Sequence, residues 1–254
     1  MVVEYEKREH LAIITLNRPE ARNAVNGEVA RRLEAALDDY EADDDLWAGI
    51  LTAKGSAFCA GADLKEISAG RGRELITKRG GFAGLTRRER TKPLIAAITG
   101  SALAGGTEIA LACDMIVCAE TTQFGLPEAK RSLVAAAGGL FRLPRAIGMA
   151  PALEAIMTGD PIPAERAYQL GMVNIMVPES EVIASAIALA KRVIAAAPVA
   201  VRESRGVAVS AFTDSDEDLW RASSAASRRN AKTEDYREGP SAFIEKRAPV
   251  WKGR

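Results

Sequence analysis

The segment from Leu94 to Glu108 reads LIAAITGSALAGGTE and combines an apolar run, a glycine turn and the start of a helix. Leu94–Thr99 has the length and composition of a buried strand, and Gly100–Gly106 supplies the small residues of a tight turn. A helix that opens on such a turn has N–H groups without helical partners, and the positive end of its dipole points outward. The segment therefore predicts a site for negative charge within an α/β fold.

The first half of the chain repeats this alternation of strands, turns and helices. Two strands are expected over Val2–Leu16, an amphipathic helix over Ala24–Asp43, and a buried strand over Ala48–Ala53. Alternation of this kind indicates an α/β protein. After about Ile147 the pattern is mainly helical, with helices expected over Pro151–Met157, Pro163–Leu170, Glu179–Ala197, Val199–Phe212 and Ser215–Asn230, and with Pro240 near the start of a last one.

Composition excludes several classes of protein. The 254 residues include 34 acidic and 34 basic side chains, so a general surface for nucleic acid or anionic membrane is not expected. Cys59, Cys113 and Cys118 are too few for a disulfide framework, and the N-terminus lacks the pattern of a signal peptide. The expected location is the cytoplasm.

A single histidine, His10, narrows the possible chemistry. It lies in a charged, strand-like segment, whereas Ser-His-Asp and Cys-His mechanisms need a histidine base in the site. Metal sites built from histidine and cysteine also lack ligands. If the protein is an enzyme, carboxylates, lysines or main-chain groups carry the reaction, and no metal or redox cofactor is expected.

A second glycine turn, Ala57–Lys65, has small residues that let a ligand approach the main chain. Two such turns facing one point would form an oxyanion hole. Each turn could equally serve only to join a strand to a helix. Glu108 could simply favour the helix dipole, and Glu128 could be a solvated loop residue.

Several motifs occur in the same order as in a known family. They are LNRP at Leu16–Pro19 with RNA at Arg22–Ala24, FCAGADL at Phe58–Leu64, KPLIAA at Lys92–Ala97, AGGTEIA at Ala104–Ala110, CD at Cys113–Asp114, FGLPE at Phe124–Glu128, TG at Thr158–Gly159, GMV at Gly171–Val173 and EGPSAF at Glu238–Phe243. On these the chain resembles the crotonase (enoyl-CoA hydratase/isomerase) superfamily. The runs GGFAGLT, LPEAK and PSAFIEKRAPVWKGR are most similar to those of its carnitinyl-CoA dehydratases.

The resemblance implies an α/β spiral of ββα units, the crotonase fold, over residues 1–195. A helical C-terminal region over residues 196–254 would then serve in assembly into a trimer or a dimer of trimers. Apolar residues on the late helices fit that role, although they could equally pack within the chain: Ile183, Ile187, Val193 and Ile194.

The resemblance also assigns roles to individual residues. Ala62 and Gly105 would supply the two N–H groups of the oxyanion hole, and Glu108 and Glu128 would act as acid and base on one water and the α-carbon. Ala60, Ala62, Asp63, Leu64, Lys65 and Gly105 would border the acyl-CoA, which Phe243 and Lys246 of a neighbouring subunit would complete.

These roles imply an enoyl-CoA hydratase, a hydro-lyase that reversibly adds water in syn fashion to 2-enoyl-CoA, with coenzyme A as part of the substrate and not a cofactor. The alternatives are carnitinyl-CoA dehydratase specificity, an enoyl-CoA isomerase, and a non-catalytic acyl-CoA-binding protein. One departure from many hydratases is the loop Ser132–Gly139, which has alanines where proline and glycine are usual. The added methyl groups are expected to reshape the acyl pocket.

Overall fold

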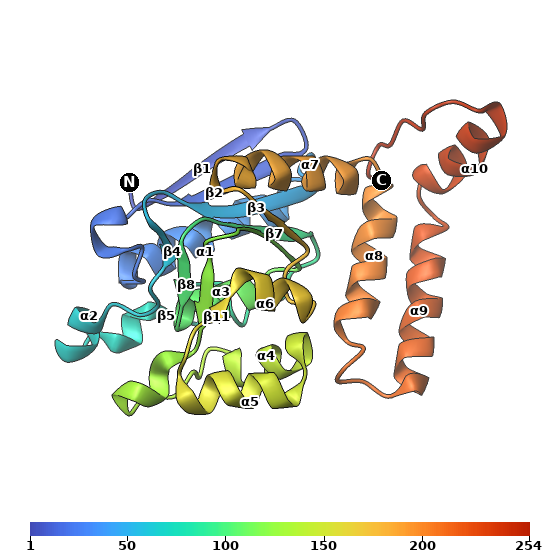
Figure 1. Ribbon diagram of the computed structural model, residues 1–254. Coiled ribbons are helices and arrows are strands. Elements are labelled where there is room, and N and C mark those ends of the chain that lie inside the picture. The colour runs from blue at the N-terminus through green and yellow to red at the C-terminus, as the bar shows by residue number, and fades with distance from the viewer.

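The computed structural model describes residues 1–254 and contains two main sheets (Figure 1). The larger has the order β1-β2-β3-β7-β9-β12, and only the β1–β2 pair is antiparallel. The second has the order β11-β10-β8-β4, and β5 pairs with β6 separately. Their bounds are β1 (Val3–Arg8), β2 (Leu11–Leu16), β3 (Ala48–Ala53), β4 (Ala57–Cys59), β5 (Ile76–Thr77), β6 (Gly81–Phe82), β7 (Leu94–Ile98), β8 (Ser101–Leu103), β9 (Met115–Ala119), β10 (Gln123–Gly125), β11 (Ile162–Pro163) and β12 (Ile175–Val177).

The chain winds through these sheets in repeated steps. Three times a strand of the larger sheet is followed by a strand of the smaller one and then by a helix. The helices that end these steps are α2 (Leu64–Ser68), α3 (Gly105–Ala112) and the 3-10 helix η3 (Pro127–Arg131). This spiral of ββα units confirms the predicted fold class.

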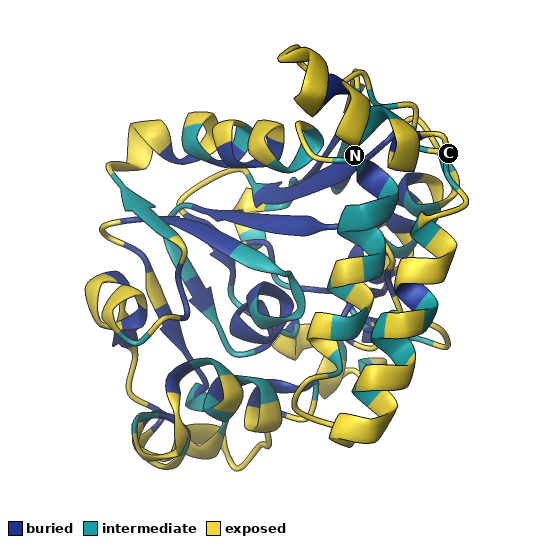
Figure 2. Ribbon diagram, turned by 90° about the vertical axis from the view of Figure 1, so that its right-hand side faces the viewer, coloured by how far each residue is buried: buried dark blue, intermediate teal, exposed yellow.

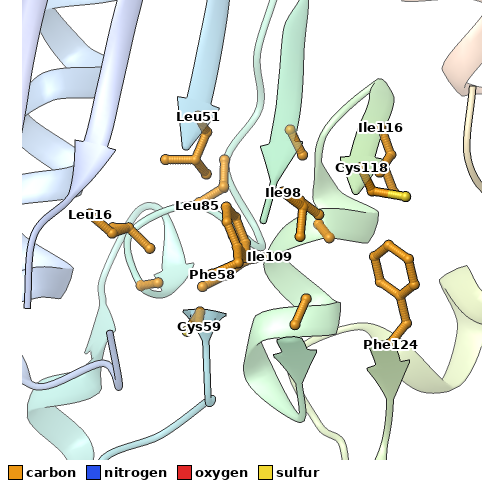
Figure 3. Close-up of a cluster of buried hydrophobic side chains, with 14 of the residues drawn as sticks. Leu16, Leu51, Phe58, Cys59, Leu85, Ile98, Ile109, Ile116, Cys118 and Phe124 are labelled. Carbon is orange, nitrogen blue, oxygen red and sulfur yellow. The ribbon is translucent and has the colours of Figure 1, made fainter. Parts of the chain in front are cut away.

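Strand periodicity divides the core between the two faces of the larger sheet. Successive side chains of a strand point to opposite faces, so Ile14 and Leu16 of β2 face the smaller sheet and Leu11 and Ile13 face the other way. Figure 3 shows the inner cluster, in which Phe58 and Phe124 of the smaller sheet approach Ile98 and Ile109. The outer face is covered by α7 (Val182–Ile194), which lies across the sheet in Figure 1.

Two further helices have a clear local cause. The first, α1 (Gly27–Ala42), begins where the Asn26 side chain accepts a hydrogen bond from the N–H of Val29. Its buried Val29, Leu33 and Leu37 recur at four-residue spacing and form one stripe against the core. In α7, Ile187, Val193 and Ile194 pack against the outer cluster. Of the two roles considered for the late-helix apolar residues, packing within the chain is therefore observed for these three. Ile183 is 39% exposed and does not belong to the cluster.

The remaining helices surround the lower and C-terminal parts of the molecule. They are α4 (Gly139–Ile147), α5 (Met149–Thr158), α6 (Ala164–Gln169), α8 (Pro198–Val209), α9 (Asp216–Asn230) and α10 (Asp235–Glu245). Figure 2 shows α8 and α9 as neighbouring helices with much exposed surface. The expected boundary after residue 195 lies between α7 and α8, and a division into separate domains stays a prediction. No single helix is long and apolar enough to cross a membrane; α7 and α8 reach that length only together, across a bend of 103°.

Several sequence-based expectations differ from the structure. Ala57–Lys65 and Gly100–Gly106 were expected as glycine turns, yet each contains a three-residue strand, β4 or β8. Pro240 lies inside α10 and not at its start, because Thr233 Oγ1 accepts a hydrogen bond from the Tyr236 N–H and starts the helix earlier. Helix α4, which includes Pro144, was not predicted.

Candidate active site

The two glycine turns of the sequence meet in the structure. Gly61 has a φ of +92°, and a Cβ at that position would lie 2.9 Å from the nitrogen of Gly105. A Cβ on Gly106 would lie 2.1 Å from the carbonyl oxygen of Cys59. Contacts this close leave room only for glycine. The turns are therefore in direct contact at the point where α3 begins.

Main-chain N–H groups of both turns are left without a partner in the fold. The Val25 N–H donates to Gly61 O at 2.8 Å and the Asp63 N–H donates to Val25 O at 2.9 Å, which leaves the Ala62 N–H between them unused. Gly105 is the first residue of α3, so its N–H has no acceptor within the helix. Ala62 and Gly105 both line one cavity of about 890 Å³.

Glu108 lies in the first turn of α3 and lines the same cavity. It is 3% exposed, and its Oε1 accepts a hydrogen bond of 2.9 Å from the Gly139 N–H. Burial raises the pKa of this carboxyl, while the N–H groups of Gly139 and Ala137 and the charge of Arg142 oppose the rise. The Glu108 carboxyl is therefore held at a fixed position in the cavity.

Glu128 reaches the cavity from η3. Its Oε2 is buried and has no hydrogen-bond partner. Burial, and then the nearby Glu108 carboxylate, raises the pKa of Glu128 to about 7. Two carboxyl groups with different surroundings therefore share the cavity: one accepts the Gly139 N–H, and the other has an oxygen without a partner. Such a difference is typical of an acid–base pair.

Arg142 joins two walls of the cavity. Its guanidinium donates to the carbonyl oxygen of Thr86 at 2.7 Å and to that of Ala137 at 3.3 Å. A Cβ on Gly138 would lie 2.1 Å from Arg142 Nη1, so this contact also requires the glycine. No local sequence pattern marks the contact of Arg142 with Thr86, since the two residues lie in segments far apart in the chain.

The predicted coenzyme A segment forms another part of the cavity lining. Asp63 caps α2 by accepting from the Lys65 N–H and pairs with Arg18 at 2.7 Å. Burial alone would raise the pKa of Asp63, but Arg18 and the Lys65 N–H outweigh it and lower the pKa. All the predicted substrate-binding residues of this chain's core line the cavity: Ala60, Ala62, Asp63, Leu64, Lys65 and Gly105.

Phe243 and Lys246 do not join this cavity within one chain. Phe243 is on α10 and is 85% exposed, and Lys246 follows the end of that helix. In Figure 1, α10 and α2 lie at opposite ends of the molecule. A role for these two residues toward a neighbouring subunit stays a prediction.

Known proteins resemble the chain in both sequence and fold. A family model described as enoyl-CoA hydratase/isomerase matches residues 6–254. A carnitinyl-CoA dehydratase from Salmonella typhi is 40% identical over 247 residues, which cover 95% of this chain and 94% of that protein. The crystal structure of an enoyl-CoA hydratase from Mycobacterium marinum has a TM-score of 0.95 and 44% identity, with 100% of this chain and 99% of that one covered. That of a carnitinyl-CoA hydratase from Mycobacterium avium has a TM-score of 0.78 and 42% identity over 100% and 99% of the two chains.

These similarities extend over nearly the whole chain and include the segments that build the cavity. The resemblance inferred from the sequence motifs is confirmed. The protein belongs to the enoyl-CoA hydratase/isomerase family.

Proposed function

We propose that the protein adds water to 2-enoyl-CoA thioesters at Glu108 and Glu128, with the thioester oxygen bound by the N–H groups of Ala62 and Gly105. The enzyme is a hydro-lyase of the hydratase type, and the reaction runs in either direction. The observation that carries the proposal is the convergence of one buried carboxyl group, one half-buried carboxyl group and two unused N–H groups on one cavity.

The N–H groups would act on the charge that the reaction develops. When water attacks C3 of the enoyl group, electrons move through C2 and negative charge accumulates on the thioester oxygen. Donors at Ala62 and Gly105, together with the dipole of α3, stabilise that charge. Loss of one such donor typically costs about 3–4 kcal/mol in the barrier.

The two carboxyl groups differ in a way that suggests their roles. Glu108 accepts the Gly139 N–H, which favours its ionised form, so it would take the proton of the attacking water. Glu128, with a pKa of about 7, would be protonated in about half of the molecules at neutral pH, and this form would deliver its proton to C2. With both carboxyl groups on the same side of the bound enoyl group, water and proton would be added to the same face, and the addition would be syn.

Coenzyme A would lie along Ala60–Lys65, and it is part of the substrate.

We propose assembly into a trimer or a dimer of trimers through the C-terminal helices. Large apolar side chains there are exposed in the single chain, among them Phe212 at 73%, Trp220 at 74% and Phe243 at 85%. Light scattering of the purified protein tests this: a trimer or hexamer is expected, and a monomer at micromolar concentration would contradict it. The cytoplasm stays the expected location.

Turnover of crotonyl-CoA tests the proposed reaction. The absorbance of the conjugated thioester is expected to disappear, and the product is expected to gain the mass of one water. An isomerase would move a double bond without a change in mass. A protein that only binds acyl-CoA would retain the ligand equally well as Glu128→Gln and would have no activity to lose. Failure to turn over any 2-enoyl-CoA would refute the proposal.

A further inference from the structure

The acyl end of the cavity lies between two walls that can be traced from the reacting carbonyl. The first wall includes Phe82, since a Cβ on Gly105 would lie 2.5 Å from a ring carbon of Phe82. It continues through Thr86, whose carbonyl oxygen Arg142 ties to the opposite wall at Ala137. That second wall, Leu133–Ala137, presents Leu133, Val134 and small alanines to the cavity. The second wall is therefore apolar, and the first presents one aromatic ring beside Thr86.

The acyl end of the cavity has no acidic side chain that is free to bind a cation. Four acidic residues line the whole cavity. Two of these, Glu20 and Asp63, lie 3.9 Å and 2.7 Å from Arg18, which borders the predicted coenzyme A segment Ala60–Lys65. The other two are Glu108 and Glu128, which the reaction itself uses. No acidic side chain remains to neutralise a positive charge on the acyl group.

Arg87 adds a positive charge to the first wall, next to Thr86. It follows Thr86, is exposed, lines the cavity and forms no ion pair. Its side-chain stem packs over Gly81, where a Cβ would lie 2.6 Å from Arg87 Cγ. The stem of the side chain is thus packed, and the guanidinium that it carries would add positive charge next to Thr86.

The aromatic content of the cavity is equally unfavourable for a cation. Phe82 is its single aromatic lining residue. Quaternary ammonium groups are usually bound by several aromatic faces or by a spare carboxylate. One ring, without such a carboxylate and beside an arginine, does not provide that environment.

We propose that the acyl end of this cavity selects uncharged acyl groups and excludes those with a quaternary ammonium, and that Arg87 is a specificity-determining residue. The inference rests on the proposed function for the position of the substrate. It separates this chain from the carnitinyl-type specificity that the names of several relatives would suggest.

Two pairs of thioesters test the selectivity with the full-length protein. In the first, kcat/KM is measured for crotonyl-CoA and for crotonobetainyl-CoA. In the second, the dissociation constants of butyryl-CoA and γ-butyrobetainyl-CoA are measured by calorimetry. The uncharged member of each pair is expected to be favoured by at least about tenfold, because like charges within one cavity repel each other at the effective dielectric constant of about 20 that holds near a protein surface. Binding needs no catalysis, so it reports on selectivity even if the proposed reaction fails.

Arg87→Glu identifies the residue responsible. Glutamate keeps the Cβ and Cγ that cover Gly81, so folding is expected to be unaffected, and both ratios are expected to fall by at least about tenfold, less at high salt. Arg73→Glu is the matched control, because Arg73 is also exposed and unpaired but does not line the cavity. It is expected to leave both ratios unchanged.

The results test the selectivity for uncharged acyl groups separately from the proposed hydration reaction. Preference of the wild-type protein for γ-butyrobetainyl-CoA or crotonobetainyl-CoA would overturn the inference, as would ratios that Arg87→Glu changes by less than twofold. Selective binding of butyryl-CoA without turnover of any enoyl thioester would support the selectivity and refute the proposed reaction.

Discussion

The two ends of the cavity are built from different kinds of structure. At the reacting end, the proposed donors are main-chain N–H groups of Ala62 and Gly105, held where two glycine turns touch. At the acyl end, side chains on Phe82–Arg87 and Leu133–Ala137 line the cavity. The first arrangement tolerates few residues because main-chain atoms are in contact. The second can change with every substitution of an exposed side chain, so that one fold can retain a reaction while its specificity varies.

The largest expected effect is at the reacting end. Glu108→Gln and Glu128→Gln each remove one proton-transfer group and preserve its shape, so kcat is expected to fall by at least about a hundredfold, with little change in butyryl-CoA binding. Steady-state kinetics and calorimetry measure the two quantities. A wild-type rate for either variant would remove that residue from the mechanism.

Gly105→Ala tests the close approach of the turns. Its Cβ would meet the Phe82 ring, whereas the N–H is preserved, so kcat is expected to fall by about tenfold through displacement of the turn and not through loss of the donor. Leucine lacks the outer ring atoms of phenylalanine, so Gly105→Ala/Phe82→Leu is expected to recover part of the rate relative to Phe82→Leu alone. The absence of any recovery would show that another contact of Gly105 is decisive.

The pH dependence of the rate separates the two acids. If Glu128 must be protonated for hydration, kcat in that direction falls as the pH rises through about 7, the pKa of its carboxyl. Dehydration needs the ionised form and is expected to have the opposite dependence on this group. Rate profiles in both directions between pH 5 and 9 measure this. The same dependence in both directions would contradict the assignment.

The same carboxyl links stability to pH. Its folded-state pKa lies above the ordinary value of 4.5, so between about pH 4.5 and 7 the unfolded chain loses a proton that the folded protein keeps. Stability therefore falls as the pH rises through this range. Glu128→Gln is expected to have a higher Tm than the wild-type protein at pH 8 and a similar Tm near pH 4. An equal difference at both pH values would mean that the burial of this charge has no role.

A smaller effect is expected at Arg142, which joins the two walls of the cavity. Arg142→Lys keeps the charge near Glu108 but loses the fork that binds the Thr86 and Ala137 carbonyls. The KM for crotonyl-CoA is expected to rise several-fold, with a smaller change in kcat, and the free energy of unfolding to fall by about 1 kcal/mol. A larger loss in kcat than in binding would place Arg142 with the reacting end instead.

The sequence predicted the reacting end better than the acyl end for a physical reason. The strand, turn and helix of Leu94–Glu108 depend on local sequence, and the glycines that permit main-chain contact can be identified directly in it. The short strands β4 and β8 were missed because three residues between glycines resemble a turn. The contact of Arg142 with Thr86 joins residues 56 positions apart, and no periodicity marks it. Phe243 and Lys246 depend on a second chain, so their role stays a prediction.

Isotopic labelling tests the central claim most directly. Crotonyl-CoA is incubated with the enzyme in water enriched in deuterium and ¹⁸O, and the product is analysed by mass spectrometry and NMR. One ¹⁸O at C3 and one deuterium at C2, added to the same face, are expected from the wild-type protein, and neither label should enter at a comparable rate with Glu108→Gln. Deuterium without ¹⁸O, addition to opposite faces, or full labelling by that variant would contradict the account.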